Sequence, residues 1–63
     1  MRLFTSKSIR GVEYNSQTKD LAVYFNNGRI YVHHGVPKEV YEQFVNAPSK
    51  GQYYNLYIRG KYL

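Results

Sequence analysis

The last fifteen residues of the chain combine aromatic and cationic side chains and contain no acid. Tyrosine rings can stack on nucleic-acid bases, and arginine and lysine neutralise phosphates, so this composition suits a nucleic-acid surface. It equally suits a segment that packs on the domain's own core with its phenol hydroxyls in water. The segment carries Tyr53, Tyr54, Tyr57, Tyr62, Lys50, Arg59 and Lys61.

The residues between these side chains predict how the segment is built. Gly51, Asn55 and Gly60 interrupt any helical or strand period, so we expect an ordered but irregular path. In the structural alternative, the two glycines permit turns, Asn55 bonds backbone groups, and the cations face water. The side chains expected to pack on the rest of the domain are then Tyr54, Ile58 and Tyr62.

Size and charge limit the class of protein. The 63 residues make a single domain, residues 1–63, which is near the lower size limit for folding without disulfides, bound metals or oligomerisation. The chain has a net charge of +5 and no cysteine, so we expect neither disulfides nor thiolate metal sites. The sequence shows no apolar run typical of a signal peptide or a membrane span, so we expect a soluble cytoplasmic protein without a membrane partner.

Catalytic and metal-binding patterns are not found in the sequence. No phosphate-binding loop or nucleophile elbow occurs, and the serines lie near expected turns, so we predict no enzyme and no cofactor. His33 and His34 are adjacent and would point to opposite faces of a strand, which disfavours a shared metal ion. We expect His33 to pack as an aromatic side chain and His34 to lie at the sheet edge.

Periodicity predicts an α+β fold. Alternating apolar residues predict strands over residues 8–14 and 20–25. Residues 37–47 predict a helix with Pro37 in its first position and Pro48 beyond its end. We therefore expect a small antiparallel sheet of three to four strands, one helix packed on it, and the irregular C-terminal segment.

The turn at Asn26-Asn27-Gly28 determines the register of the second hairpin. A two-residue turn places Val23 opposite Val32, which buries the aliphatic residues of the following strand. A three-residue turn with Gly28 left-handed places Val23 opposite Tyr31. The aliphatic pattern alone mildly favours the first arrangement and does not decide between them.

A series of residues in a fixed order extends over residues 6–62. Its members are Ile9, Val12, Tyr14, Leu21, Val23, Phe25, Gly28, Tyr31, Val36-Pro37, Val40-Tyr41, and the closing pattern Ser49-x-Gly51-x-x-x-Asn55-x-x-Ile58-Arg59-Gly60-x-Tyr62. This order resembles the KTSC domain, a short module named after the C-terminus of some lysyl-tRNA synthetases.

The resemblance implies a register for the second hairpin and a partner. The family has a central Tyr-x-Tyr pattern, which reads Tyr31-Val32-His33 in this chain. The family pattern implies that positions 31 and 33 lie on the same face of the sheet as Leu21 and Val23. We therefore adopt the three-residue turn. The synthetase context of the family implies RNA as a partner.

Two functions follow as expectations. The first is a non-enzymatic module that binds RNA or single-stranded nucleic acid, with Tyr53 or Tyr57 stacking on bases. The alternative is a protein-interaction or homodimerising module, because nothing in so short a chain obviously covers its strand edges. Arg59 either holds a ligand phosphate or fastens the terminal segment by bonding carbonyls, Glu13 or Asp20, and we narrowly favour the fastener. The phosphate contacts expected in the first case are Arg10, Arg29, Lys50, Arg59 and Lys61.

Overall fold

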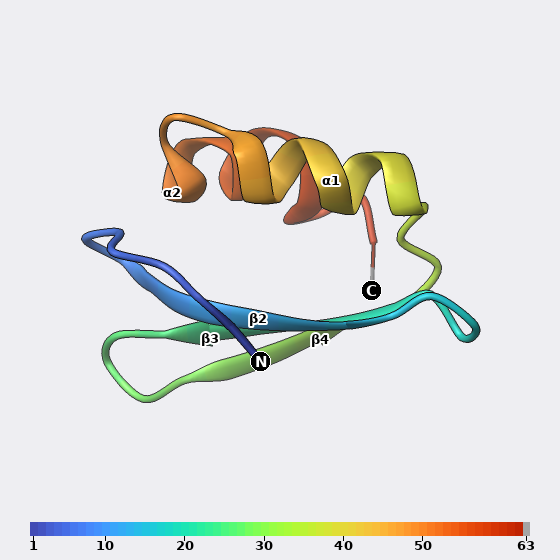
Figure 1. Cartoon of the computed structure of the whole chain (residues 1–63), viewed down its shortest axis with the longest axis horizontal. Helices are drawn as coiled ribbons and strands as arrows, with labels where there is room; N and C mark the ends of the chain where they lie inside the picture. The colour runs from blue at the N-terminus through green and yellow to red at the C-terminus, as the bar shows by residue number, and fades with distance from the viewer. Residues whose placement is uncertain (63) are drawn as a thin grey trace.

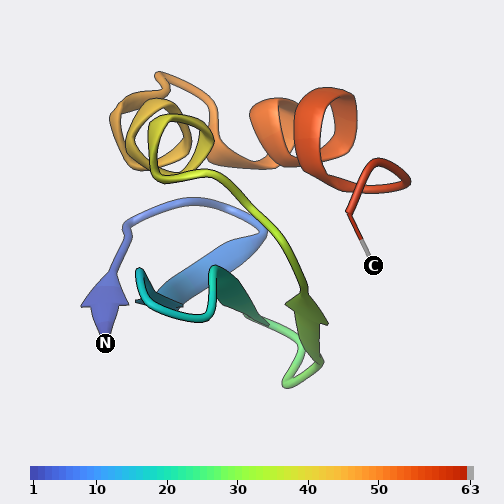
Figure 2. The same cartoon turned by 90° about the vertical axis from the view of Figure 1, so that its right-hand side faces the viewer.

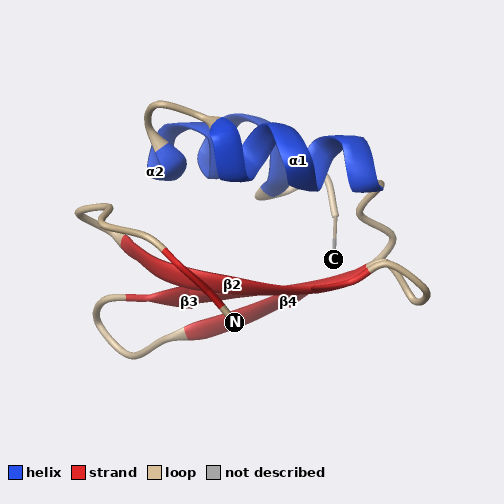
Figure 3. Cartoon of the chain, viewed as in Figure 1, coloured by secondary structure: helices blue, strands red, loops and turns tan. Residues whose placement is uncertain are grey.

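The computed structural model describes residues 1–62 and has two layers. A four-stranded antiparallel sheet in the order β1-β2-β3-β4 forms one layer, and helices cover one of its faces (Figure 1). The α+β prediction is confirmed. The strands are β1 Arg2–Leu3, β2 Ile9–Asn15, β3 Asp20–Phe25 and β4 Ile30–His33. The helices are α1 Lys38–Asn46, α2 Lys50–Tyr53 and the π-helical η1 Tyr54–Ile58 (Figure 3).

The second hairpin has the three-residue turn. Phe25 donates its N–H to the carbonyl of Arg29 at 2.8 Å, and Gly28 has φ +90°, a left-handed conformation that glycine adopts without strain. Leu21 pairs with His33, and Val23 pairs with Tyr31. The adopted register is therefore confirmed.

Helix α1 begins one residue later than expected. Pro37 is extended, with φ −63° and ψ 150°, and serves as the N-cap rather than as the first helical residue. Its carbonyl still accepts the N–H of Tyr41, which starts the helical hydrogen bonding. The apolar stripe expected on this helix is present, with Phe44 buried and its neighbours half-buried against the core.

The C-terminal segment is helical, so the prediction of an irregular path is wrong. Ser49 caps α2 by accepting the N–H of Gln52, and η1 continues directly from α2 with wider turns. A Cβ at Gly51 would lie 2.6 Å from the Ser8 hydroxyl oxygen, so this glycine serves a close approach inside a helix rather than a turn. Gly60, with φ +83°, does form the expected turn after η1.

The helical C-terminal segment completes the core. It lies beside α1 above the sheet (Figure 2). Tyr54 and Ile58 are buried and Tyr62 packs partly buried against them, as predicted. No helix among residues 1–62 has the length and apolar character needed to cross a membrane. The remaining core side chains are Ile9, Val12, Leu21, Val23, Val36 and Phe44.

Strand β1 is held against β2 at Gly11. A Cβ at this position would lie 2.6 Å from the carbonyl oxygen of Arg2, a backbone atom that cannot rotate away. We predict that Gly11→Ala displaces β1 and lowers the free energy of unfolding by about 1–3 kcal/mol, measured by thermal unfolding. Gly51→Ala is the matched control, because the Ser8 hydroxyl can rotate and alanine favours the helix. Equal melting temperatures for Gly11→Ala and the unmodified chain would contradict this account.

Candidate functional site

A groove of about 450 Å³ lies between the β3–β4 turn and the C-terminal helical segment. We call it the arginine groove, because it brings together two arginines that lie thirty positions apart in the sequence. Pockets of roughly 300–1,000 Å³ hold small-molecule ligands in proteins, so its volume suits one nucleotide-sized group. Its lining consists of Phe25, Asn27, Arg29, Tyr31, His33, Tyr54, Asn55 and Arg59.

Aromatic rings form one wall of the arginine groove. The ring of Phe25 meets Tyr31 edge-on at a centroid distance of 5.5 Å and Tyr54 at 5.3 Å. Such packing fixes the ring orientations. Tyr31 remains 44 % exposed, so part of its ring is available to a ligand.

His33 connects the sheet to the C-terminal segment from inside the groove. Its Nδ1 lies 2.8 Å from the carbonyl oxygen of Tyr62, and its Nε2 lies 2.8 Å from the hydroxyl oxygen of Tyr54. A carbonyl only accepts, so Nδ1 carries a proton and donates it. Burial raises the pKa of Tyr54, which keeps its hydroxyl protonated as the donor to Nε2.

The two histidines therefore behave as expected. His33 is buried as an aromatic side chain, while His34 is exposed and its Nδ1 lies 2.7 Å from a carboxylate oxygen of Asp20. Hydrogen bonding to His34 holds the pKa of Asp20 below its usual range. Within residues 1–62, no three His, Asp or Glu side chains gather as a metal site would require.

Arg29 and Arg59 approach the groove from different elements. Arg29 leaves the hairpin turn, where its N–H donates to the Asn27 side-chain oxygen at 3.0 Å, and its Nη1 lies 3.4 Å from the Tyr31 hydroxyl. Arg59 follows η1 in an extended conformation and is exposed. A phosphate between them could receive charge-assisted hydrogen bonds from two planar guanidinium groups.

Within residues 1–62, Arg59 does not attach the C-terminal segment to the rest of the domain, contrary to what the sequence had led us to expect. Its guanidinium makes no hydrogen bond or ion pair with any other residue in the range 1–62. The two expected acidic partners are occupied elsewhere: Glu13 accepts the hydroxyl of Tyr24 at 2.6 Å, and Asp20 bonds His34. No residue in the described part of the chain therefore occupies the Arg59 guanidinium.

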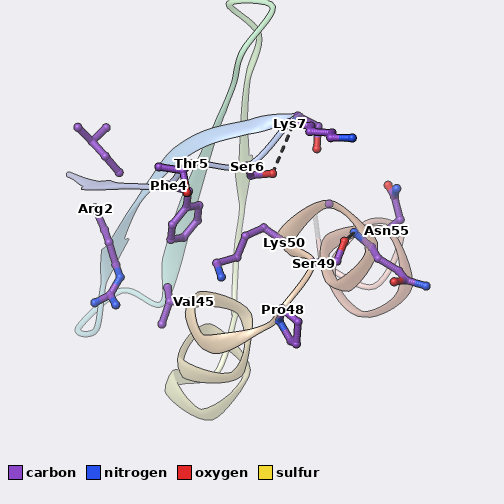
Figure 4. A pocket seen from close by; sticks show the side chains of 14 residues that line it. Arg2, Phe4, Thr5, Ser6, Lys7, Val45, Pro48, Ser49, Lys50 and Asn55 are labelled. Atoms are coloured by element: carbon purple, nitrogen blue, oxygen red, sulfur yellow. Dashed lines mark hydrogen bonds between the residues drawn. The ribbon is translucent and has the colours of Figure 1, made fainter.

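Lys50 lies at a different groove. This second groove, of about 840 Å³, separates the N-terminal segment from the start of α2 (Figure 4). The Lys50 side chain extends toward Phe4 and Val45, and its Nζ lies 2.5 Å from the carbonyl of Ala47 and 5.2 Å from the Phe4 ring centroid. Lys50 is thus engaged in packing, contrary to the expectation that it simply faces water.

The remaining predicted binding residues are scattered. Tyr53 stacks on Phe44, and its ring is tilted by 39° against that of Tyr57 at a centroid distance of 4.7 Å. The Nζ of Lys61 lies 5.9 Å from the Tyr57 ring centroid. Arg10 is exposed at the irregularity of β2 and lines neither groove. Of the seven residues predicted for nucleic-acid binding, the arginine groove contains only Arg29 and Arg59.

Several groove residues were not predicted as site residues. Asn55, expected to bond the backbone, is exposed at the groove and makes no side-chain hydrogen bond within residues 1–62. Tyr31 could have been found from the register of the hairpin, which places it beside Phe25 and near Arg29. Phe25, Asn27 and His33 lie on the same hairpin as Tyr31. The presence of Tyr54 and Asn55 beside them had no sequence signal, because it depends on where the C-terminal helix packs. Besides Tyr31, the groove residues that were not predicted are Phe25, Asn27, His33, Tyr54 and Asn55.

The hydrogen bonds of His33 predict a large loss of stability on substitution. His33→Phe keeps a ring in the core but leaves the Tyr54 hydroxyl and the Tyr62 carbonyl without their partner. We predict a loss of about 1–3 kcal/mol in the free energy of unfolding, measured by urea denaturation. His34→Gln at the exposed neighbour is the control and should change stability by less than about 0.5 kcal/mol. Similar losses for both variants would refute the role given to His33.

The tyrosine pKa values predict a loss of stability in alkali. Burial raises the pKa of Tyr54 in the folded state, so the neutral phenol stabilises the fold fully below about pH 10, its pKa when unfolded. This stabilisation is lost as the pH rises through the folded-state pKa. Urea denaturation across this range should show falling stability, with a shallower fall for Tyr54→Phe. The same slope in both proteins would contradict the prediction.

The comparisons with known proteins agree with this architecture. The family model described as KTSC domain matches residues 5–62. A crystal structure of a KTSC domain protein from Yersinia pestis has a TM-score of 0.94 to this chain at 29% identity, covering 98% of this chain and 87% of that one.

Curated relatives include much longer proteins. A lysine–tRNA ligase of Nostoc punctiforme is 41% identical over 54 residues, and that of Trichormus variabilis is 43% identical over 54 residues. Each match covers 86% of this chain but 10% of the ligase, so the chain spans about a tenth of their length. An uncharacterized protein of Stutzerimonas stutzeri is 34% identical over 50 residues, which cover 79% of this chain and 70% of that protein. Because the family model covers nearly the whole sequence, the chain belongs to the KTSC domain family.

Proposed function

We propose that this small KTSC domain binds RNA, or single-stranded nucleic acid generally, through the arginine groove. The observation that carries the proposal is the guanidinium of Arg59, which has no hydrogen-bond or ion-pair partner among residues 1–62 and lies with Arg29 on a groove walled by aromatic rings. Proteins that bind single strands combine these two features, cations for the backbone and aromatic faces for the bases.

The groove offers each part of a nucleotide a suitable group. An unstacked base would lie on the exposed part of the Tyr31 ring, and the adjoining phosphate would accept hydrogen bonds from Arg29 and Arg59. The side-chain amides of Asn27 and Asn55 supply donors and acceptors at the same groove for base edges. A base paired inside a duplex has no free face for Tyr31, so single strands fit better than duplexes.

Charge and family context support RNA as the ligand. The net charge of +5 favours polyanions in general. Lysine–tRNA ligases, whose name states that they act on tRNA, carry a segment 41–43% identical to this chain. That association is with a short part of a long enzyme, so it supports RNA as the first ligand to test.

A binding role also fits the groove better than catalysis. Three groove residues have acid–base chemistry. His33 and Tyr54 are committed to hydrogen bonds that hold the core together. The Tyr31 hydroxyl lies 3.4 Å from the Nη1 of Arg29. A general acid or base must be able to exchange a proton with a substrate. We therefore infer a non-enzymatic module.

The proposal predicts which substitutions weaken binding. Labelled single-stranded RNA, single-stranded DNA and duplex oligomers are titrated at low salt. Arg59→Gln should cost about 2 kcal/mol, roughly 30-fold in affinity, and should make the dependence on salt shallower. Arg59→Lys should recover part of the loss, because it keeps the charge but not the planar fork. Tyr31→Ala should weaken binding by about 1–3 kcal/mol through lost stacking.

Lys38→Gln is the matched control. Lys38 is exposed at the first residue of α1 and does not line the arginine groove, and its substitution removes the same charge. Equal losses for Lys38→Gln and Arg59→Gln would show that only net charge matters. The absence of binding below millimolar concentration for every oligomer would refute the proposal.

A further inference from the structure

Strand β4 carries its side chains in an unusual order. Ile30 is 54 % exposed and Val32 is 49 % exposed, whereas His33 is buried and Tyr31 lies in the arginine groove. A sheet covered on one face normally turns aliphatic residues inward and polar residues toward water. Here the two aliphatic side chains of β4 lie on the face away from the helices.

The same face is apolar across the sheet. Strand pairing aligns Leu3, Gly11, Tyr24 and Ile30 in one row. The neighbouring row aligns Glu13, Ala22 and Val32. We call these seven residues the outer face. Within residues 1–62, no other segment covers this side of the sheet in either view (Figures 1 and 2).

The outer face differs in charge from the rest of the protein. It contains none of the nine lysines and arginines of the chain. Its one acid, Glu13, accepts the hydroxyl of Tyr24 at 2.6 Å on the same face. At the end of the sheet, Asp20 is likewise bonded to His34. The polar groups therefore have partners before anything docks, which lowers the cost of burying them.

We infer that the outer face packs against the outer face of a second copy of this chain. A two-fold symmetric dimer brings identical patches together, which favours a face that is mostly apolar and whose single acid, Glu13, is already hydrogen-bonded to Tyr24. Two chains of charge +5 would bring cations together at other surfaces, whereas this face has none. Exposed apolar patches rimmed by polar residues mark interaction sites in soluble proteins.

The area of the outer face limits the affinity expected for the dimer. The protein measures 28 × 21 × 20 Å along its principal axes, so the face of the sheet is no larger than the two longer dimensions allow. Two such faces would bury at most roughly 1,100 Å², which lies below the range of stable specific interfaces and within that of weak, transient ones. The dimer is therefore weak and depends on concentration. It does not involve the arginine groove, which opens on the opposite side of β4.

The test is the solution mass across a concentration series. Light scattering on the unmodified chain from micromolar to millimolar concentration should show the mass rising from 7.5 kDa toward twice that value. Val32→Lys should remain at the monomer mass, because it places a charged side chain in the apolar contact of each copy. Leu56→Lys, which adds the same charge at a 57 % exposed apolar residue of η1, should dimerise as the unmodified chain does.

A second measurement, on the unmodified chain, tests the dimer contact even if Val32→Lys impairs folding. Amide chemical shifts of the unmodified chain should change with concentration at Leu3, Tyr24, Ile30 and Val32 and stay constant at Leu56. A monomer mass at millimolar concentration would overturn the inference. So would equal effects of Val32→Lys and Leu56→Lys, or concentration-dependent shifts confined to residues outside the outer face.

Discussion

The three-residue turn after β3 is the constraint on which the rest of the structure depends. With Gly28 left-handed, Tyr31 and His33 face the helices, and Ile30 and Val32 face away. A turn one residue shorter would exchange the two sets. His33 would then lose its bonds to the C-terminal segment, and Tyr31 would leave the groove. One turn thus determines the attachment of the terminal helix, the aromatic wall and the apolar outer face.

The sequence predicted the sheet and α1 because their side chains repeat with the periods of a strand and a helix. The aliphatic pattern alone did not determine the register of the β3–β4 hairpin, and it favoured burying Ile30 and Val32. Each buried aliphatic side chain contributes about 1.5–3 kcal/mol, so the pattern is normally a sound guide. It failed here because the side chains that receive the terminal helix are aromatic and polar. Only the family's Tyr-x-Tyr pattern, which this chain keeps at Tyr31 and replaces by histidine at His33, contained that information.

The C-terminal segment was mispredicted because local propensity was given more weight than packing. Gly51 and Asn55 disfavour a helix, yet Tyr54 and Ile58 lie four positions apart on one helical face and are buried. Ser49 with Gln52 three residues later also resembles a helix start. These two signals together could have indicated the helix. The proximity of Arg29 and Arg59 could not be predicted, because it depends on where this helix packs against the hairpin.

The distribution of charge separates the two proposed surfaces. The sheet's acids already have hydrogen-bond partners, Tyr24 for Glu13 and His34 for Asp20, so neither neutralises Arg59. A guanidinium that has no partner among residues 1–62, as Arg59 has none, attracts solution ions or a bound anion, and the release of such ions favours binding of a polyanion. The outer face has no cation and gains nothing from a polyanion, but it loses water from apolar side chains when covered. Because β4 supplies Tyr31 to one side and Ile30 and Val32 to the other, each surface can be altered by substitution without changing the chemistry of the other.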